Sequence, residues 1–128
     1  MRIFLALVGL LVATPPVAQA DVPIGLWQTE PDRTGNVFHV RTRACGPDLC
    51  GQIERVKNRF GYDTPSRDVG RNLLSGMREL GEGRFEGQVW EPDTNRMLSA
   101  RMHVQGNTIR MTRCASQDCS STSWHRLR

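Results

Sequence analysis

The sequence predicts an all-β fold, a single small antiparallel barrel of about eight strands in up-and-down order. Short segments of alternating apolar and polar residues are broken by turn residues about every eight to twelve positions, which is typical of sandwiches and barrels. The chain has no internal repeat and no long amphipathic helix. Because an even number of sequentially connected strands closes most simply on itself, we expect a barrel that leaves no sheet edge open.

The first twenty residues have the three parts of a secretory signal peptide: a basic start at Met1-Arg2, an apolar stretch over residues 3–13, and the small-x-small end Ala18-Gln19-Ala20. A membrane anchor is the alternative, but this stretch as a helix spans only about 16 Å against roughly 30 Å of hydrocarbon. We therefore expect cleavage after Ala20, no transmembrane anchor after processing, and a periplasmic or secreted product.

Residues 21–128 are enough for one domain and for no second core. Of the 17 basic residues of the chain, Arg2 leaves with the signal, so 16 basic and 13 acidic residues remain and the net charge is +3. This charge is mild, and export argues against nucleic acid as a partner. An anionic envelope polymer or an envelope protein stays open as a partner.

The first strand is expected over residues 25–29, and it ends at the turn residues 31–36. The second, over residues 37–43, alternates cleanly and so should have one wet face. Its inward side is predicted to carry Phe38, Val40 and Thr42. The third strand, over residues 49–56, returns across a hairpin.

The pattern then lapses, and residues 58–70 form the longest segment without periodicity. A loop of this length in a compact domain is usually functional or mobile. It contains Arg59, Phe60, Tyr62 and Arg67, and aromatic and arginine side chains are the types that anchor interfaces. We therefore predict that this segment, the 58–70 loop, carries recognition; a loop with no role is the alternative.

Five further strands follow between short turns rich in Gly, Asn, Asp and Pro. The stretch 97–104 alternates well, with Leu98, Ala100, Met102 and Val104 predicted inward. The expected strands are residues 73–80, 84–91, 96–105, 108–114 and 123–127.

Four cysteines fall in two pairs of equal spacing, Cys45 with Cys50 and Cys114 with Cys119. An oxidising compartment makes disulfides the default. Each intervening tetrapeptide has turn residues, and cysteines that flank a hairpin loop lie close to disulfide geometry, so local pairing is favoured among the three connectivities. A zinc site is the rival, but four-residue spacers at both ends are at the wide limit for zinc.

The opening Gly25-x-Trp27 resembles the Gly-x-Trp that calycin and lipocalin-type barrels place at their closed end, with an arginine of the last strand over the indole. Arg126 is the expected cation, and such a contact contributes roughly 0.5–2 kcal/mol. We assign Gly25, Trp27 and Arg126 to barrel closure, which makes the predicted barrel calycin-like.

Seven short motifs follow one another along the mature chain. They are Pro23-x-Gly25-x-Trp27, Leu49-Cys50-Gly51-Gln52-Ile53, Leu73-Leu74-Ser75-Gly76-Met77, Gly83-Arg84-Phe85-Glu86-Gly87, Trp90-Glu91-Pro92-Asp93-Thr94-Asn95-Arg96, Arg113-Cys114 and Trp124-x-Arg126. In this order they resemble the exported bacterial proteins grouped as domain of unknown function family 2147. The resemblance implies a calycin-like barrel and no particular activity.

No catalytic constellation is found. Ser75 lacks the strand-turn-helix setting of a nucleophile elbow. Asp63 and Asp68 lie five residues apart in the 58–70 loop, where turn-forming and solvated carboxylates are expected. His39 and His103 fall on the polar faces of two strands, and we expect no metal and no cofactor.

The sequence leaves two hypotheses about function open. The first is a non-catalytic interaction or inhibitor-type module of the cell envelope, a filled barrel whose 58–70 loop docks on a partner. The second is a carrier that holds a small lipophilic ligand inside the barrel. Because Met77, Met102 and Met111 suit the packing of irregular space, a filled interior and the interaction module are favoured.

Overall fold

The computed structural model of the chain describes residues 3–4, 6, 8–11 and 23–128, and these contain eight strands. Most of the predicted signal peptide, with its cleavage site at residues 18–20, lies outside the described residues. Among the described residues, no helix is long and apolar enough to span a bilayer. The strands are β1 (Gly25–Gln28), β2 (Val37–Cys45), β3 (Asp48–Lys57), β4 (Asn72–Gly81), β5 (Arg84–Glu91), β6 (Arg96–Gln105), β7 (Thr108–Ala115) and β8 (Asp118–Arg126).

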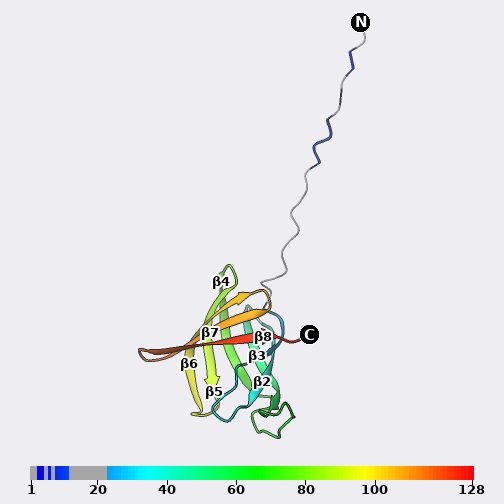
Figure 1. Ribbon diagram of the computed structural model, residues 1–128. Helices are drawn as coiled ribbons and strands as arrows, with labels where there is room; N and C mark the ends of the chain where they lie inside the picture. Colours follow the sequence, from blue (N-terminus) through cyan, green and yellow to red (C-terminus); the bar gives the residue numbers. More distant parts are fainter. Residues whose placement is uncertain (1–2, 5, 7, 12–22) are drawn as a thin grey trace.

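Each strand pairs antiparallel with the next in the chain, and β1 pairs with β8, so the sheet closes into a barrel (Figure 1). The closing pair is short, with only Trp27 opposite Arg126 and Gln28 opposite His125. The predicted all-β, up-and-down barrel of eight strands is confirmed.

The barrel interior is packed by one apolar cluster that draws on all eight strands. Along β6 the side chains of Leu98, Ala100, Met102 and Val104 are buried, as the alternation predicts. Along β2, Val40 and Thr42 are fully buried while Arg41 is exposed. The period of two in these strands therefore places one face inside and one in water.

Two disulfides cross-link the strands of two hairpins. Cys45 is bonded to Cys50 between β2 and β3, and Cys114 is bonded to Cys119 between β7 and β8. This is the local pairing that the spacing favours. Since stable disulfides are typical of oxidising compartments, the two bridges indicate an extracellular or periplasmic protein.

The last strand begins earlier than the sequence predicts, at Asp118 and not at Ser123. Its first part pairs with β7 from Ala115 opposite Asp118 onward, and the hairpin projects beyond the barrel (Figure 1, orange to red). Residues 118–121 are exposed. Because both faces of this part are wet, its sequence has no alternation from which a strand could be predicted.

The 58–70 loop is attached to the sheet. β4 pairs with β3 only as far as Gln52 opposite Asn72, and beyond that point the loop takes the place of a strand. The amide of Gly70 donates to the carbonyl of Ile53 (2.8 Å), and the amide of Thr64 donates to the carbonyl of Val56 (2.9 Å). The loop therefore covers an edge of β3 that would otherwise be open.

Candidate functional site

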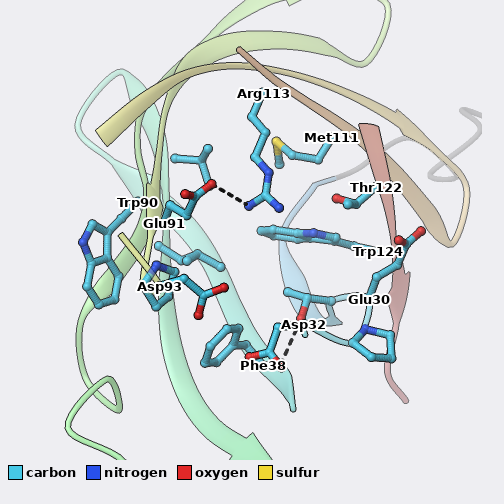
Figure 2. A pocket seen from close by; sticks show the side chains of 15 residues that line it. Glu30, Asp32, Phe38, Trp90, Glu91, Asp93, Met111, Arg113, Thr122 and Trp124 are labelled. Carbon is cyan, nitrogen blue, oxygen red and sulfur yellow. Dashed lines mark hydrogen bonds and ion pairs between the residues drawn. The ribbon is translucent and has the colours of Figure 1, made fainter. Parts of the chain in front are cut away.

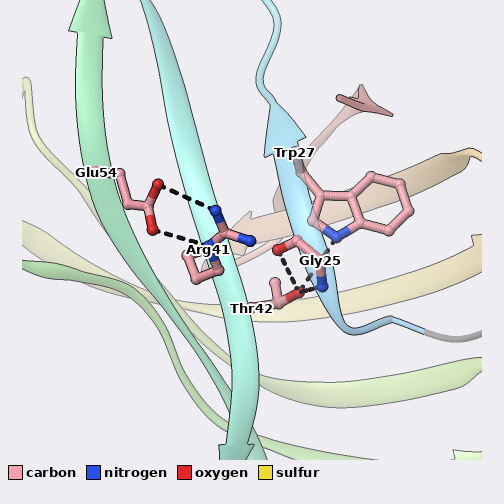
Figure 3. A network of polar contacts seen from close by, with 5 residues as sticks. All are labelled: Gly25, Trp27, Arg41, Thr42 and Glu54. Atoms are coloured by element: carbon pink, nitrogen blue, oxygen red, sulfur yellow. Dashed lines mark hydrogen bonds and ion pairs between the residues drawn. The ribbon is translucent and has the colours of Figure 1, made fainter. Parts of the chain in front are cut away.

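The closed end of the barrel is organised around the buried indole of Trp27 (Figure 3). Its Nε1 donates to the carbonyl of Pro23 (2.9 Å) and to Oγ1 of Thr42 (3.2 Å). The Thr42 hydroxyl, itself fully buried, accepts from the amide of Gly25 (3.0 Å) and donates to the carbonyl of Pro23. The buried Thr42 hydroxyl thus both donates and accepts hydrogen bonds, and these bonds hold the chain before β1 across the barrel end.

The guanidinium of Arg126 lies over the Trp27 ring, 4.2 Å from its centroid. It also donates from Nη1 to the carbonyl of Ile24 (2.9 Å). Gly25 leaves room for this arrangement, because a Cβ there would lie 2.7 Å from Nη1 of Arg126, and its φ of +152° is one that side chains rarely adopt. Gly25, Trp27 and Arg126 meet as the sequence predicts, and the Thr42 hydroxyl accepts hydrogen bonds from the first two.

At the tip of the 58–70 loop the backbone is fixed by Asn58. Its amide donates to the carbonyl of Tyr62 (2.8 Å), and its carbonyl accepts from Gly61 (2.9 Å). Its side-chain Oδ1 accepts from the amides of Phe60 (3.0 Å) and Tyr62 (3.1 Å). Local side-chain bonds of this kind define a turn, so the tip is a hydrogen-bonded turn.

This turn presents its two aromatic side chains to solvent. Phe60 is 69% exposed and Tyr62 is 71% exposed. The guanidinium of Arg59 lies 4.9 Å from the centroid of the Phe60 ring, and Arg67 is exposed elsewhere in the loop. These aromatic rings do not plug the barrel end; they extend the surface.

Ion pairs join the base of the loop to β3. The Asp63 carboxylate lies 3.2 Å from Nζ of Lys57 and 3.7 Å from Nη1 of Arg55. Next to them on β2, Nε2 of His39 lies 3.1 Å from Oε1 of Gln28. Partial burial lowers the pKa of His39, and the positive charges of Lys57 and Arg55 lower it further. The ion pairs of Asp63 with Lys57 and Arg55 anchor the loop, and Asp63 is the solvated, turn-forming carboxylate that the sequence leads us to expect.

A second candidate site is a small pocket of about 110 Å³, called the mouth pocket below (Figure 2). Phe38, Leu73 and Trp124 are among its buried lining residues, and carboxylates stand around it, including Asp93. Pockets for drug-sized ligands have about 300–1,000 Å³. The pocket is smaller than that and polar at its rim.

Glu91 is the carboxylate of this pocket that interacts with two arginines. It accepts a hydrogen bond from the Thr94 hydroxyl (2.7 Å) and lies 3.7 Å from Arg96 and 3.9 Å from Arg113. The hydrogen bond from Thr94, together with the charges of Arg113 and Arg96, holds the pKa of Glu91 below its usual value against the opposing effect of burial. Sequence reasoning missed this network, although Glu91 and Arg113 both lie in motifs that carry the family resemblance.

A second contact missed from the sequence joins Arg71, the residue after the 58–70 loop, to Trp90 of the pocket lining. The guanidinium of Arg71 lies 3.8 Å from the centroid of the Trp90 ring, and the indole Nε1 donates to Oδ1 of Asn95 (3.0 Å). Trp90 is buried, so the stacked arginine covers it from outside. The pairing of an arginine and a tryptophan this far apart in sequence leaves no local signal.

The remaining candidates stay separate. His39 lies on β2 and His103 on β6, and these strands are not neighbours. Among the described residues, no three His, Cys, Asp or Glu side chains are placed to share a metal ion.

Comparison with known proteins agrees with this architecture. The model of a family described as "Uncharacterized protein conserved in bacteria (DUF2147)" matches residues 25–126. A solved structure of protein HP1028 from Helicobacter pylori, described as belonging to the lipocalin family, is similar with a TM-score of 0.66 and 14% identity over 82% of each chain. At this identity the likeness shows the fold alone. No curated protein sequence matches the chain.

Proposed function

The chain belongs to the DUF2147 family of uncharacterised bacterial proteins, and from this premise we propose that it is a non-catalytic interaction or inhibitor-type module of the periplasm. In this proposal the barrel is a rigid support and the 58–70 loop is the part that binds. The partner is a protein of the cell envelope.

One observation carries the proposal: two exposed aromatic rings stand on a turn that Asn58 stabilises through hydrogen bonds. Large apolar side chains usually avoid water, and aromatic residues flanked by arginine are the commonest anchors of protein interfaces. Because Asn58 fixes the backbone that bears Phe60 and Tyr62, little conformational entropy is lost when a partner covers them. Exposed aromatic groups on a preorganised turn favour a protein surface over a polymer of charged groups.

A carrier of lipophilic ligands fits less well. The mouth pocket of about 110 Å³ holds only a few water-sized groups. Its rim bears the carboxylates of Glu30, Asp32 and Asp93, and an apolar ligand leaving water would have to pass them. The two disulfides support the proposed compartment.

The test replaces both rings, Phe60→Ser with Tyr62→Ser, in the mature protein. Because the rings are exposed, the free energy of unfolding should change by less than about 1 kcal/mol. Capture of envelope proteins by the immobilised variant should fall to background. A matched control, Leu80→Ser with Met97→Ser, removes two other exposed apolar side chains and should capture as wild type does. Equal capture by the loop variant and wild type would remove the proposal.

A further inference from the structure

The outer face of the barrel carries a groove of about 540 Å³ over β5, β6 and β7, which lie side by side in the sheet (Figure 1). It is remote in sequence from the 58–70 loop and shares no lining residue with the mouth pocket. The groove is therefore a separate feature of the molecule.

Basic side chains meet in this groove because of the strand register. Arg84 on β5 stands directly opposite His103 on β6, and His103 stands directly opposite Arg110 on β7. Two residues along β6, Arg101 stands opposite Thr112 on β7. All five residues line the groove. Three guanidinium groups and an imidazole are thus gathered over three adjacent strands.

The lining of the groove contains three arginines and one carboxylate, that of Glu86. Glu86 stands directly opposite Arg101 on β6, and its carboxylate accepts a hydrogen bond from Arg78 of β4. In the described part of the chain, Arg84, Arg101 and Arg110 make no ion pair. The residues opposite Arg84 and Arg110 on the neighbouring strands are Gly81, His103 and Ser123, none of which is acidic. The lining therefore has two more arginines than carboxylates, and an anion in the groove would balance this excess positive charge.

The spacing of the groups indicates the shape of the anion. Neighbouring strands lie about 4.8 Å apart, and alternate residues of a strand lie about 6.7 Å apart. Two of the arginines, Arg84 and Arg110, lie level with His103 across the sheet, and Arg101 lies two residues away along β6. The three therefore surround an area that two linked phosphates can span. Guanidinium groups bind phosphate oxygens in bidentate fashion.

We propose that this groove binds a soluble ligand with two adjacent phosphate groups, in addition to the interaction proposed for the 58–70 loop. Charge complementarity favours a phosphate-bearing occupant. Leu80 is the only large exposed apolar side chain among the groove's lining residues, all of which are described, and this favours a soluble occupant over a membrane surface. A membrane-binding face would need more apolar contact than this.

The test measures the affinity of the mature protein for pyrophosphate by titration calorimetry at constant ionic strength. Wild type should bind pyrophosphate more tightly than orthophosphate. The double variant Arg84→Gln with Arg110→Gln should weaken pyrophosphate binding by about tenfold or more, the loss expected for two charge-assisted contacts. A control of equal net charge, Arg33→Gln with Arg43→Gln, removes two exposed arginines outside the groove and should change the affinity by less than about twofold.

Three results would overturn the proposal: no binding of pyrophosphate by wild type, an equal loss in the control variant, or binding to phosphatidylglycerol vesicles without binding to pyrophosphate. The variant Phe60→Ser with Tyr62→Ser should bind pyrophosphate as wild type does, so the groove and the loop are tested separately. Circular dichroism of each variant establishes that it is folded before titration.

Discussion

At the scale of single residues, the closed end shows what one sequence motif does and does not reveal. The Gly25-x-Trp27 opening and a terminal Arg126 were enough to predict the contact that the structure contains, a guanidinium 4.2 Å from the indole centroid. The role of Thr42 was not predictable, because a threonine in an alternating strand reads as an ordinary β-former. Its buried hydroxyl nevertheless links Gly25, Trp27 and Pro23.

Replacing Trp27 with alanine should lower the free energy of unfolding by about 3–5 kcal/mol, the range for deleting a large buried aromatic side chain. Arg126→Ala should cost less, because Arg126 is only partly buried. Chemical denaturation of both single variants and the double variant gives the coupling energy. A coupling clearly different from zero is expected, and strictly additive effects would show that the two side chains do not stabilise each other.

Glu91 gives a pH prediction. Its pKa is lowered in the folded protein, so the stability it contributes is present above its unfolded pKa of about 4.5 and is lost as the pH falls through the lower, folded value. Between about pH 5 and pH 3 the Tm of Glu91→Gln should therefore fall less steeply than that of wild type. Thermal melts across this range measure the slope. The exposed Glu79→Gln should follow wild type, and a Glu91→Gln slope equal to wild type would contradict the account.

At the scale of elements, alternation predicted every strand that has one dry face. It failed where backbone pairing alone forms the structure. The start of β8 has both faces in water, and the 58–70 loop bonds to β3 through main-chain groups such as the Gly70 amide and the Ile53 carbonyl. Main-chain hydrogen bonds do not depend on side-chain type, so neither feature is visible in the sequence.

The hairpin of β7 and β8 should open locally when its disulfide is removed. In Cys114→Ala with Cys119→Ala, a closed loop of about six residues is lost, which by the loop-entropy rule lowers stability by about 2 kcal/mol at most. Amide hydrogen exchange should quicken at Ser120 and Ser121, in the exposed first part of β8, and stay slow at Val104 and Ile109 in the core. Equal acceleration at all four amides would show that the hairpin and barrel unfold as one unit.

At the scale of the whole molecule, the fold class, the strand order and the closing contact follow from the sequence, whereas both surface hollows do not. The mouth pocket and the outer groove exist because register brings distant residues together, as it brings Arg84 to His103 and His103 to Arg110. Register is set by the complete closed sheet and not by any single segment. Candidate sites of this kind therefore need the three-dimensional structure.

The expected export of the chain leads to a prediction about its processing and its cysteines. Protein recovered from the periplasm should begin at Asp21, because the small-x-small site ends at Ala20, and it should contain no free thiol. Intact-mass analysis before and after treatment with an alkylating reagent measures both. Uptake of the label by unreduced protein would overturn the disulfide assignment, and a retained leader would overturn the processing.

The central claim is that a rigid barrel presents the 58–70 loop to a protein partner, and site-specific photo-crosslinking in living cells tests it most directly. A photoreactive amino acid is placed at position 62, in the exposed turn, and separately at position 97, where Met97 is also exposed. The account predicts a discrete crosslinked product of one size from position 62 and none from position 97. No product from position 62, or the same products from both positions, would contradict it.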